Sequence, residues 1–275
     1  MMSGFAEVDG GRLYYETAGD GPALVLIHAG FLDSRMWDLQ FQLFSKSYKV
    51  IRYDVRGFGR SEIAKSSFSD SKDLYLLLNR LNVERISIIG VSNGGRIALD
   101  FVVDYPDMVS SIILVSPGVS GYKVSGPAEE KLWVEFEERM KPQEVADREG
   151  RAADAVEMDV EAWASAQNET SRQRIREIAM DNFHVHLENP WKFLVKRDPP
   201  TFQRLDDIRI PTLFIVGDRD VPPQIIEVDH LHSRIPGSNK IVIEGADHIP
   251  NMSRPEEFER IVLRFLEDQK LTVQP

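Results

Sequence analysis

Short apolar runs alternate with polar, turn-forming segments along most of the chain. Two of these runs, residues 24–27 and 112–115, are apolar at every position, which is typical of strands in a parallel sheet that is covered on both faces. The first two runs flank residues 9–11 (DGG) and predict a hairpin. Strands are predicted at residues 5–8, 12–17, 23–27, 49–53, 85–90, 110–115, 211–216 and 240–243.

Helical patterns lie between these strands. Apolar residues recur every three or four positions over residues 97–105, where Pro106 ends the pattern, and over residues 74–81. A last helix is predicted at residues 255–268. The alternation of strand and helix at this spacing predicts right-handed parallel crossovers, and hence a mostly parallel sheet with helices on both faces.

The pattern changes between residues 120 and 205. Strand-like runs are absent there, and long charged stretches such as 128–141 and 170–183 predict three or four amphipathic helices. Strand-like runs then return. We therefore predict one core domain made of residues 1–119 and 206–275, with a helical insertion at residues 120–205.

Composition narrows the classes of function. The chain carries 33 Lys and Arg against 44 Asp and Glu, a net charge of -11, which disfavours binding to nucleic acid or anionic lipid. It has no cysteine, which excludes disulfides, thiolate metal sites and a cysteine nucleophile. No signal peptide and no apolar run of membrane-spanning length is visible. We expect a cytoplasmic monomer or homodimer whose partner is a small-molecule substrate, not nucleic acid or a membrane.

The first candidate for chemistry is residues 90–94 (GVSNG), which join a predicted strand to a predicted helix. Glycines two residues before and after Ser92 allow the strand and the helix to cross closely. The serine hydroxyl is then raised above the sheet at a helix N-terminus, as in a nucleophile turn. An ordinary glycine-rich connection is the alternative. A phosphate-binding loop is disfavoured because the stretch lacks its lysine.

A base and an orienting acid are expected after other strands, because ligands bind at the carboxyl edge of a doubly wound sheet. His248 follows the last predicted strand, and Asp218 and Asp220 follow the strand before it. Asp218 lies beside a glycine and is expected to close the turn, which leaves Asp220 to hold His248. The order Ser92, Asp220, His248 is that of nucleophile, acid and base.

The other histidines do not predict a metal site. His184 and His186 lie two residues apart, and so do His230 and His232. On a helix, this spacing directs the two members of a pair to different sides, and neither pair has a third ligand nearby. We expect no metal and no cofactor.

Several ordered motifs resemble those of the α/β-hydrolase superfamily, in its lidded branch of small esterases, lactonases and carbon–carbon bond hydrolases. Residues 28–31 (HAGF) are similar to the family's oxyanion segment, residues 54–61 (DVRGFGRS) to its D-x-R-G-x-G-x-S turn, and residues 245–258 (GADHIPNMSRPEEF) to its histidine loop and final helix. The resemblance covers nearly the whole chain. It implies an α/β-hydrolase fold with a mostly parallel eight-stranded sheet and a lid at residues 120–205.

The same resemblance implies an oxyanion hole. Its expected donors are the backbone N–H groups of Asn93 and Gly30, with Phe31 as the alternative to Gly30 if the alignment shifts by one residue. Ala29 stands where the family usually has glycine, so a positive φ there would strain the loop. His28 is expected to fix this loop by hydrogen bonding. The side-chain amide of Asn93 either reaches the substrate or caps locally.

The lid offers apolar side chains for a substrate. We expect most of them to pack the lid onto the sheet, with Trp163 as the first choice for a residue that contacts substrate and Phe31 as a second contact from the core. The lid residues considered are Trp133, Phe136, Trp163, Met180, Phe183 and Trp191.

These residues predict a serine hydrolase of the carboxylic ester hydrolase type. It would cleave a small, largely apolar ester or lactone through an acyl-enzyme intermediate on Ser92. A carbon–carbon bond hydrolase and a cofactor-free perhydrolase would use the same triad. A binding or receptor protein that has kept the fold and lost turnover is the alternative from another class.

Overall fold

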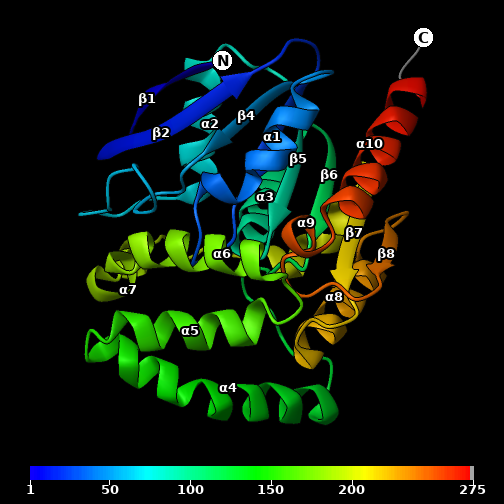
Figure 1. The fold of residues 1–275 in the computed structure, drawn as a ribbon. Helices are drawn as coiled ribbons and strands as arrows, with labels where there is room; N and C mark the ends of the chain where they lie inside the picture. The colour runs from blue at the N-terminus through cyan, green and yellow to red at the C-terminus, as the bar shows by residue number, and fades with distance from the viewer. Residues whose placement is uncertain (273–275) are drawn as a thin grey trace.

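A mostly parallel, eight-stranded sheet forms the centre of the computed structural model, which describes residues 1–272 (Figure 1). The strand order is β1-β2-β4-β3-β5-β6-β7-β8. Each strand overlaps an apolar run that predicts it, and the predicted fold class is confirmed. The strands are β1 (Met2–Val8), β2 (Gly11–Ala18), β3 (Ala23–Ile27), β4 (Lys49–Tyr53), β5 (Ile86–Val91), β6 (Val109–Val115), β7 (Thr212–Gly217) and β8 (Asn239–Ile243).

Strand pairing brings the carboxyl ends of β3 and β5 side by side. β1 and β2 form the predicted antiparallel hairpin, and β2 joins β4 antiparallel. The remaining pairs are parallel, with β3 between β4 and β5. The chain leaves β3 toward one side of the sheet and β5 toward the other, which makes this the point where an α/β sheet binds ligands. The loop that contains Gly30 follows β3, and Ser92 follows β5 directly.

Helices cover both faces of the sheet, because alternate side chains of each strand point to opposite faces. Val25 and Ile27 of β3 belong to one buried core, and Leu24 and Leu26 belong to the other. Each of these side chains, once buried, stabilises the fold by about 1.5–3 kcal/mol. The first core includes α2 (Asp70–Arg80), α3 (Asn93–Asp104) and α8 (Pro222–Arg234); the second includes α1 (Asp38–Phe44) and α10 (Pro255–Thr272).

Shorter helices connect these elements. A one-turn helix, α9 (Pro250–Ser253), precedes α10, and four 3-10 helices occur at Ser34–Trp37, Pro106–Met108, Pro190–Phe193 and Thr201–Asp207.

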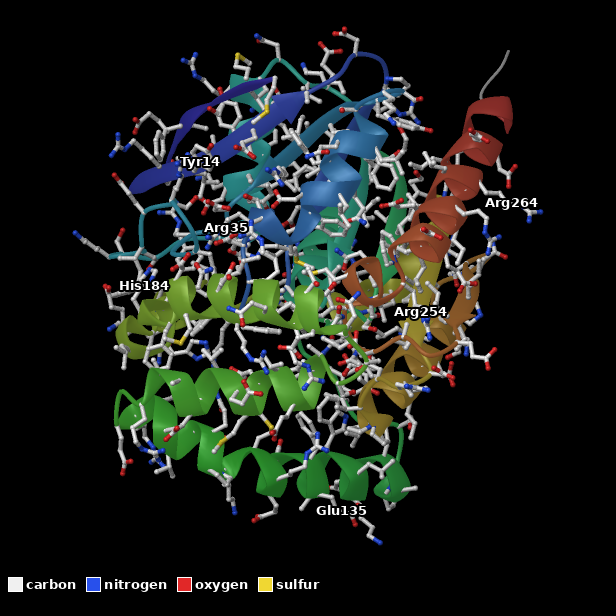
Figure 2. The ribbon with its side chains drawn as sticks, in the orientation of Figure 1. Tyr14, Arg35, Glu135, His184, Arg254 and Arg264 are labelled. Atoms are coloured by element: carbon white, nitrogen blue, oxygen red, sulfur yellow. The ribbon has the colours of Figure 1, made fainter. Side chains whose placement is uncertain are left out.

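A separate helical layer lies between β6 and β7 in the sequence. It contains α4 (Pro127–Arg148), α5 (Ala152–Trp163), α6 (Glu169–Asn182) and α7 (His184–Glu188). In Figure 1 these helices lie beyond the end of the sheet, with α6 nearest to it and α4 farthest away. Figure 2 shows Arg35 and His184 near this junction: Arg35 Nη1 lies 2.7 Å from Asp181 Oδ2, and His184 Nε2 lies 3.0 Å from Gly57 O.

Two carboxylates meet where α4 packs on α5. Asp159 of α5 is 8% exposed, and Gln143 Nε2 of α4 lies 3.4 Å from its Oδ2 atom and 2.8 Å from Asp147 Oδ2. Burial raises the pKa of Asp159 to about 7, and the nearby charge of Asp147 adds to the shift. Asp159 therefore stays protonated at pH values well above those at which an ordinary aspartate ionises.

We expect Asp159→Asn to raise the melting temperature more at pH 8 than at pH 5. The raised pKa means that the folded state binds this proton more tightly than the unfolded chain, so the stability it contributes is lost as the pH rises through about 7. An amide of the same shape avoids that ionisation, which should stabilise the variant by about 1–3 kcal/mol at pH 8. Thermal unfolding followed by circular dichroism measures the difference.

The control for this experiment is Glu161→Gln, an exposed position on the same helix. It should show no such pH dependence. An equal change for Asp159→Asn at both pH values would contradict the expected ionisation.

Candidate active site

Ser92 is the single residue between β5 and α3, and its backbone is strained. Its φ is 54° and its ψ is -115°, a conformation that residues with a side chain rarely adopt. The flanking glycines are required by close packing. A Cβ atom on Gly90 would lie 2.2 Å from Gly94 O, and one on Gly94 would lie 2.4 Å from Ile27 O. The start of α3 therefore lies against the end of β3.

Backbone hydrogen bonds with β6, with the loop after it and with α3 itself fix this turn. Ser92 N donates to Val115 O at 2.9 Å, and Ser92 O accepts from Gly118 N and Arg96 N, both at 3.1 Å. The side-chain hydroxyl takes part in none of these bonds. In the described part of the chain, residues 1–272, no hydrogen bond joins the Ser92 hydroxyl to His248.

Asp220 and His248 are in direct contact. Asp220 follows β7 and His248 follows β8; His248 Nδ1 lies 3.0 Å from both carboxylate oxygens. The exposed fractions of the two residues are 6% and 2%. Val221 N also donates to Asp220 Oδ1 at 2.7 Å, which fixes the carboxylate. A buried carboxylate on Nδ1 holds the imidazole so that Nε2 is the free nitrogen.

The alternative acid, Asp218, makes a different contact. Its Oδ1 accepts from Gly245 N at 2.6 Å, so it ties the loop after β7 to the loop before His248. We expected it to close its own turn, and instead it bridges two loops. Gly217 explains why they lie so close, since a Cβ there would lie 2.1 Å from Ala246 O.

His28 supports the loop that follows β3. Its Nε2 accepts from Val55 N at 2.8 Å, which leaves the proton on Nδ1 to donate to Ala29 O, also at 2.8 Å. Burial lowers the pKa of His28 and thereby favours this neutral form. Ala29 is not among the residues with positive φ, so the alanine causes no such strain. Gly30 lies against Ser92's neighbour, because a Cβ on Gly30 would lie 3.3 Å from Asn93 Cβ.

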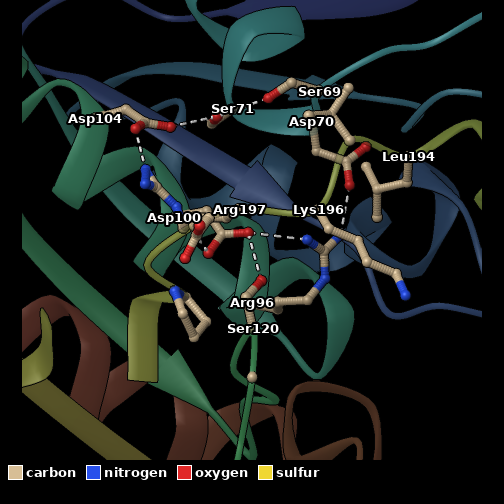
Figure 3. A pocket seen from close by; sticks show the side chains of 14 residues that line it. Ser69, Asp70, Ser71, Arg96, Asp100, Asp104, Ser120, Leu194, Lys196 and Arg197 are labelled. Carbon is tan, nitrogen blue, oxygen red and sulfur yellow. Dashed lines mark hydrogen bonds and ion pairs between the residues drawn. The ribbon is translucent and has the colours of Figure 1, made fainter. Parts of the chain in front are cut away.

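The Asn93 side chain is bound locally, which is one of the two alternatives left open by the sequence. Its Oδ1 accepts from Arg96 Nε at 2.8 Å. Arg96 also pairs with Asp70 and, at 3.0 Å, with Asp100, which in turn accepts from Ser120 Oγ at 2.8 Å (Figure 3). Arg96, its two aspartates and Ser120, but not Asn93, line a cavity of about 660 Å³ along α3. Arg96 thus joins the start of α3 to Asp70 of α2 and to Asp100 one turn further along α3, and it anchors this end of the helix.

An aromatic row leads from His248 into the helical layer. The ring centroid of Trp163, at the end of α5, lies 4.6 Å from that of His248. Phe136 of α4 follows at 4.9 Å from Trp163, and Trp133 at 6.0 Å from Phe136. Trp163, predicted to contact substrate, is therefore next to the predicted base.

The other apolar candidates lie elsewhere. Trp191 packs against Phe58, Phe183 stacks on His186, and Met180 is 42% exposed. Phe31 follows Gly30 and is partly buried against the core that contains α1 and α10. Its contact with substrate stays a prediction.

Residues 1–272 contain no group of three or more His, Asp or Glu side chains arranged to hold a metal ion. Within the same range, no helix combines the length and the apolar character needed to cross a membrane.

Four buried polar residues connect α6 to the loops of the candidate site and were not predicted from the sequence. They are Asp33, Gln167, Asn182 and Asp247. The sequence carries only a positional signal for two of them: Asp33 follows Gly30 by three residues, and Asp247 directly precedes His248.

Comparison with known proteins defines the family. The family model described as alpha/beta hydrolase fold matches residues 22–255. This match spans most of the sequence, so the chain belongs to the α/β-hydrolase family, as the motifs predict.

Individual relatives cover nearly the whole chain. It is 28% identical over 269 residues to a putative 2-succinyl-6-hydroxy-2,4-cyclohexadiene-1-carboxylate synthase of Bacillus subtilis, over 92% of this chain and 94% of that protein. It is 25% identical over 253 residues to 3-oxoadipate enol-lactonase 1 of Acinetobacter baylyi, over 90% and 89%. A thermophilic esterase from Thermogutta terrifontis has a similar fold, with a TM-score of 0.79 at 24% identity over 98% and 99% of the two chains. Homologues of this chain thus include hydrolases.

We expect Gly94→Ala to destabilise the protein by about 2 kcal/mol or more, because the added methyl would push α3 away from Ile27 O and His28 O. Thermal unfolding measures the loss. Gly118→Ala is the matched control, since an added Cβ there meets no atom within 4 Å. Equal melting temperatures for the two variants would show that the close crossing does not constrain residue 94.

Proposed function

We propose that this protein is a serine hydrolase that cleaves a small, largely apolar carboxylic ester or lactone through an acyl-enzyme intermediate. The observation that carries the proposal is the strained Ser92 turn at the switch point of the sheet, together with the buried Asp220–His248 pair on the loops after β7 and β8. A nucleophile, an oriented base and its acid thus follow strands of the same sheet.

In the proposed acylation step, Ser92 Oγ attacks the acyl carbonyl while His248 Nε2 takes its proton. Asp220 stabilises the imidazolium through the hydrogen bond to Nδ1, and the negative charge moves to the carbonyl oxygen. The N–H groups of Asn93 and Gly30 would hold this oxygen. Two features support them as donors: Asn93 opens α3, where N–H groups lack helical partners, and Gly30 lies against it.

The tetrahedral intermediate then collapses, and His248 returns the proton to the leaving alkoxide. In deacylation, His248 takes a proton from water as the water oxygen attacks the acyl carbon. The second tetrahedral intermediate then collapses, the bond between the acyl carbon and Ser92 Oγ breaks, and His248 returns the proton to Ser92 Oγ. The products are a carboxylic acid and an alcohol. A lactone substrate gives one hydroxy acid.

The proposed preference for apolar substrates rests on the aromatic row of Trp163, Phe136 and Trp133 beside His248. We propose that residues 120–205 form the lid that carries this row over the carboxyl edge. The enol-lactonase among the relatives supports a lactone or ester as substrate. Rings that bury apolar area favour alkyl or aryl acyl groups over charged ones.

We expect a fluorophosphonate probe to add its mass to the native protein and not to Ser92→Ala. The probe phosphonylates only an activated serine, so labelling reports the Ser92–His248 reaction itself. Intact mass spectrometry measures it, alongside turnover of p-nitrophenyl esters of increasing chain length. Ser116→Ala is the control, because Ser116 also has a positive φ, of 43°, at the end of the neighbouring strand. Labelling of Ser92→Ala at the native rate would refute the nucleophile assignment.

We expect Asp220→Asn to lower kcat by about 10⁴-fold, because the amide no longer stabilises the imidazolium and favours the wrong tautomer. Asp218→Asn should change kcat by less than about tenfold, since its carboxylate contacts Gly245 N and not His248. Steady-state kinetics on one ester measures both. The reverse ranking would assign the acid to Asp218.

A further inference from the structure

The amino-terminal end of α6 is attached to the loop that carries His248. Asp247 is 1% exposed and accepts from Ala166 N at 2.9 Å, from Gln167 Nε2 at 2.9 Å and from Ile249 N at 3.1 Å. Gln167 Nε2 also donates to Ile249 O at 3.2 Å. Since Ala166 and Gln167 lie between α5 and α6, these bonds hold the connection that follows Trp163 against the histidine loop.

The carboxyl-terminal end of α6 is attached to the loop that contains Gly30. Asn182 is 1% exposed; its Nδ2 donates to Asp33 Oδ2 at 2.9 Å, and its Oδ1 accepts from Gly59 N at 2.6 Å. Arg35 strengthens this end through contacts of 2.7 Å with both Asp33 and Asp181 of α6. Burial raises the pKa of Asp33, but hydrogen bonds from Arg35 and Asn182 outweigh this effect and hold the pKa below its usual value.

Both attachments consist of buried, directional hydrogen bonds. Leaving one partner of such a bond unpaired costs about 1–3 kcal/mol, and more when the partner is charged. An apolar contact can slide at little cost, whereas these bonds are satisfied in one position of α6 only. α6 has 14 residues and is therefore about 21 Å long, a rigid element that reaches from one loop to the other.

We propose that α6 is a positioning strap, which holds the histidine loop and the Gly30 loop in the arrangement that the reaction needs. One end is attached by Gln167 and Asp247. The other end is attached by Asn182 and Asp33. The four residues are positioning residues, which act through His248 and Gly30 without contacting the substrate. This inference rests on the proposed serine hydrolase function. It assigns to the helical layer a part in the chemical step beyond covering the substrate.

The first part of the test does not depend on activity. Hydrogen exchange followed by mass spectrometry should show faster exchange around Ile249 in Gln167→Ala and around Gly59 in Asn182→Ala. The matched control is Glu157→Gln, which weakens the contact of 2.7 Å between Glu157 and Arg176 inside the helical layer. It should leave exchange at both places unchanged. Unchanged exchange in both end variants would overturn the strap.

The second part measures turnover of a p-nitrophenyl ester and the rate of fluorophosphonate labelling. We expect each end variant to lower kcat and the labelling rate by about tenfold or more, with KM changed less, because small displacements of reacting groups are costly. Glu157→Gln should stay within about twofold of the native protein. A change in KM alone would make α6 only a cover for the substrate and would overturn its positioning role.

A rescue pair guards against variants that only weaken folding. Asn182→Asp keeps the size and the acceptor for Gly59 N but sets two carboxylates face to face, so kcat should fall. Adding Asp33→Asn restores a donor and an acceptor and should recover at least part of the loss. No recovery would overturn the role of this contact.

Native protein that is neither labelled nor active would overturn the proposed function, whereas an active native protein with unchanged end variants overturns the strap alone.

Discussion

The close crossing of β5, α3 and the end of β3 is the constraint on which the candidate active site depends. Gly90 and Gly94 have no space for a side chain, so the chain turns from strand to helix through one residue with positive φ. The cost of that strained backbone, of order 1–3 kcal/mol, is offset by surrounding hydrogen bonds such as those to Val115 O and from Gly118 N. The same crossing places Asn93, the first residue of α3, against Gly30.

A second constraint is the burial of polar groups along this edge. Asp33, Asp220, Asp247 and His248 are each 6% exposed or less, and each has hydrogen-bond partners within the chain. Low exposure strengthens each of these bonds and makes the loss of a partner costly. The loops after β3, β7 and β8 are therefore held by specific partners, although loops are usually the mobile parts of a fold.

Much of this arrangement could be predicted from the sequence. Buried parallel strands are continuous apolar runs, as at residues 112–115, and Ser92 directly follows such a strand. His248 follows β8, an edge strand whose side chains are mostly exposed, although its apolar run also predicts the strand. The sequence left open whether the Asn93 side chain reaches the substrate or binds locally, because its contact with Arg96 is set only in the folded chain. It gave no sign of the contact between Asn182 and Asp33, which are 149 residues apart. Contacts of that kind depend on where a helix lies, and periodicity predicts only that the helix exists.

The helical layer uses two kinds of contact for two purposes. The aromatic row from Trp163 to Trp133 buries apolar area, which stabilises the layer and can adapt to ligands of different shape. The hydrogen bonds at the two ends of α6 contribute less net free energy per contact, but they are satisfied in one geometry only. A layer held by apolar contacts alone could shift over the edge as substrates change. Under the proposed function, with both ends of α6 attached, changes in the aromatic row would alter which substrate fits while the loops beneath it keep their geometry.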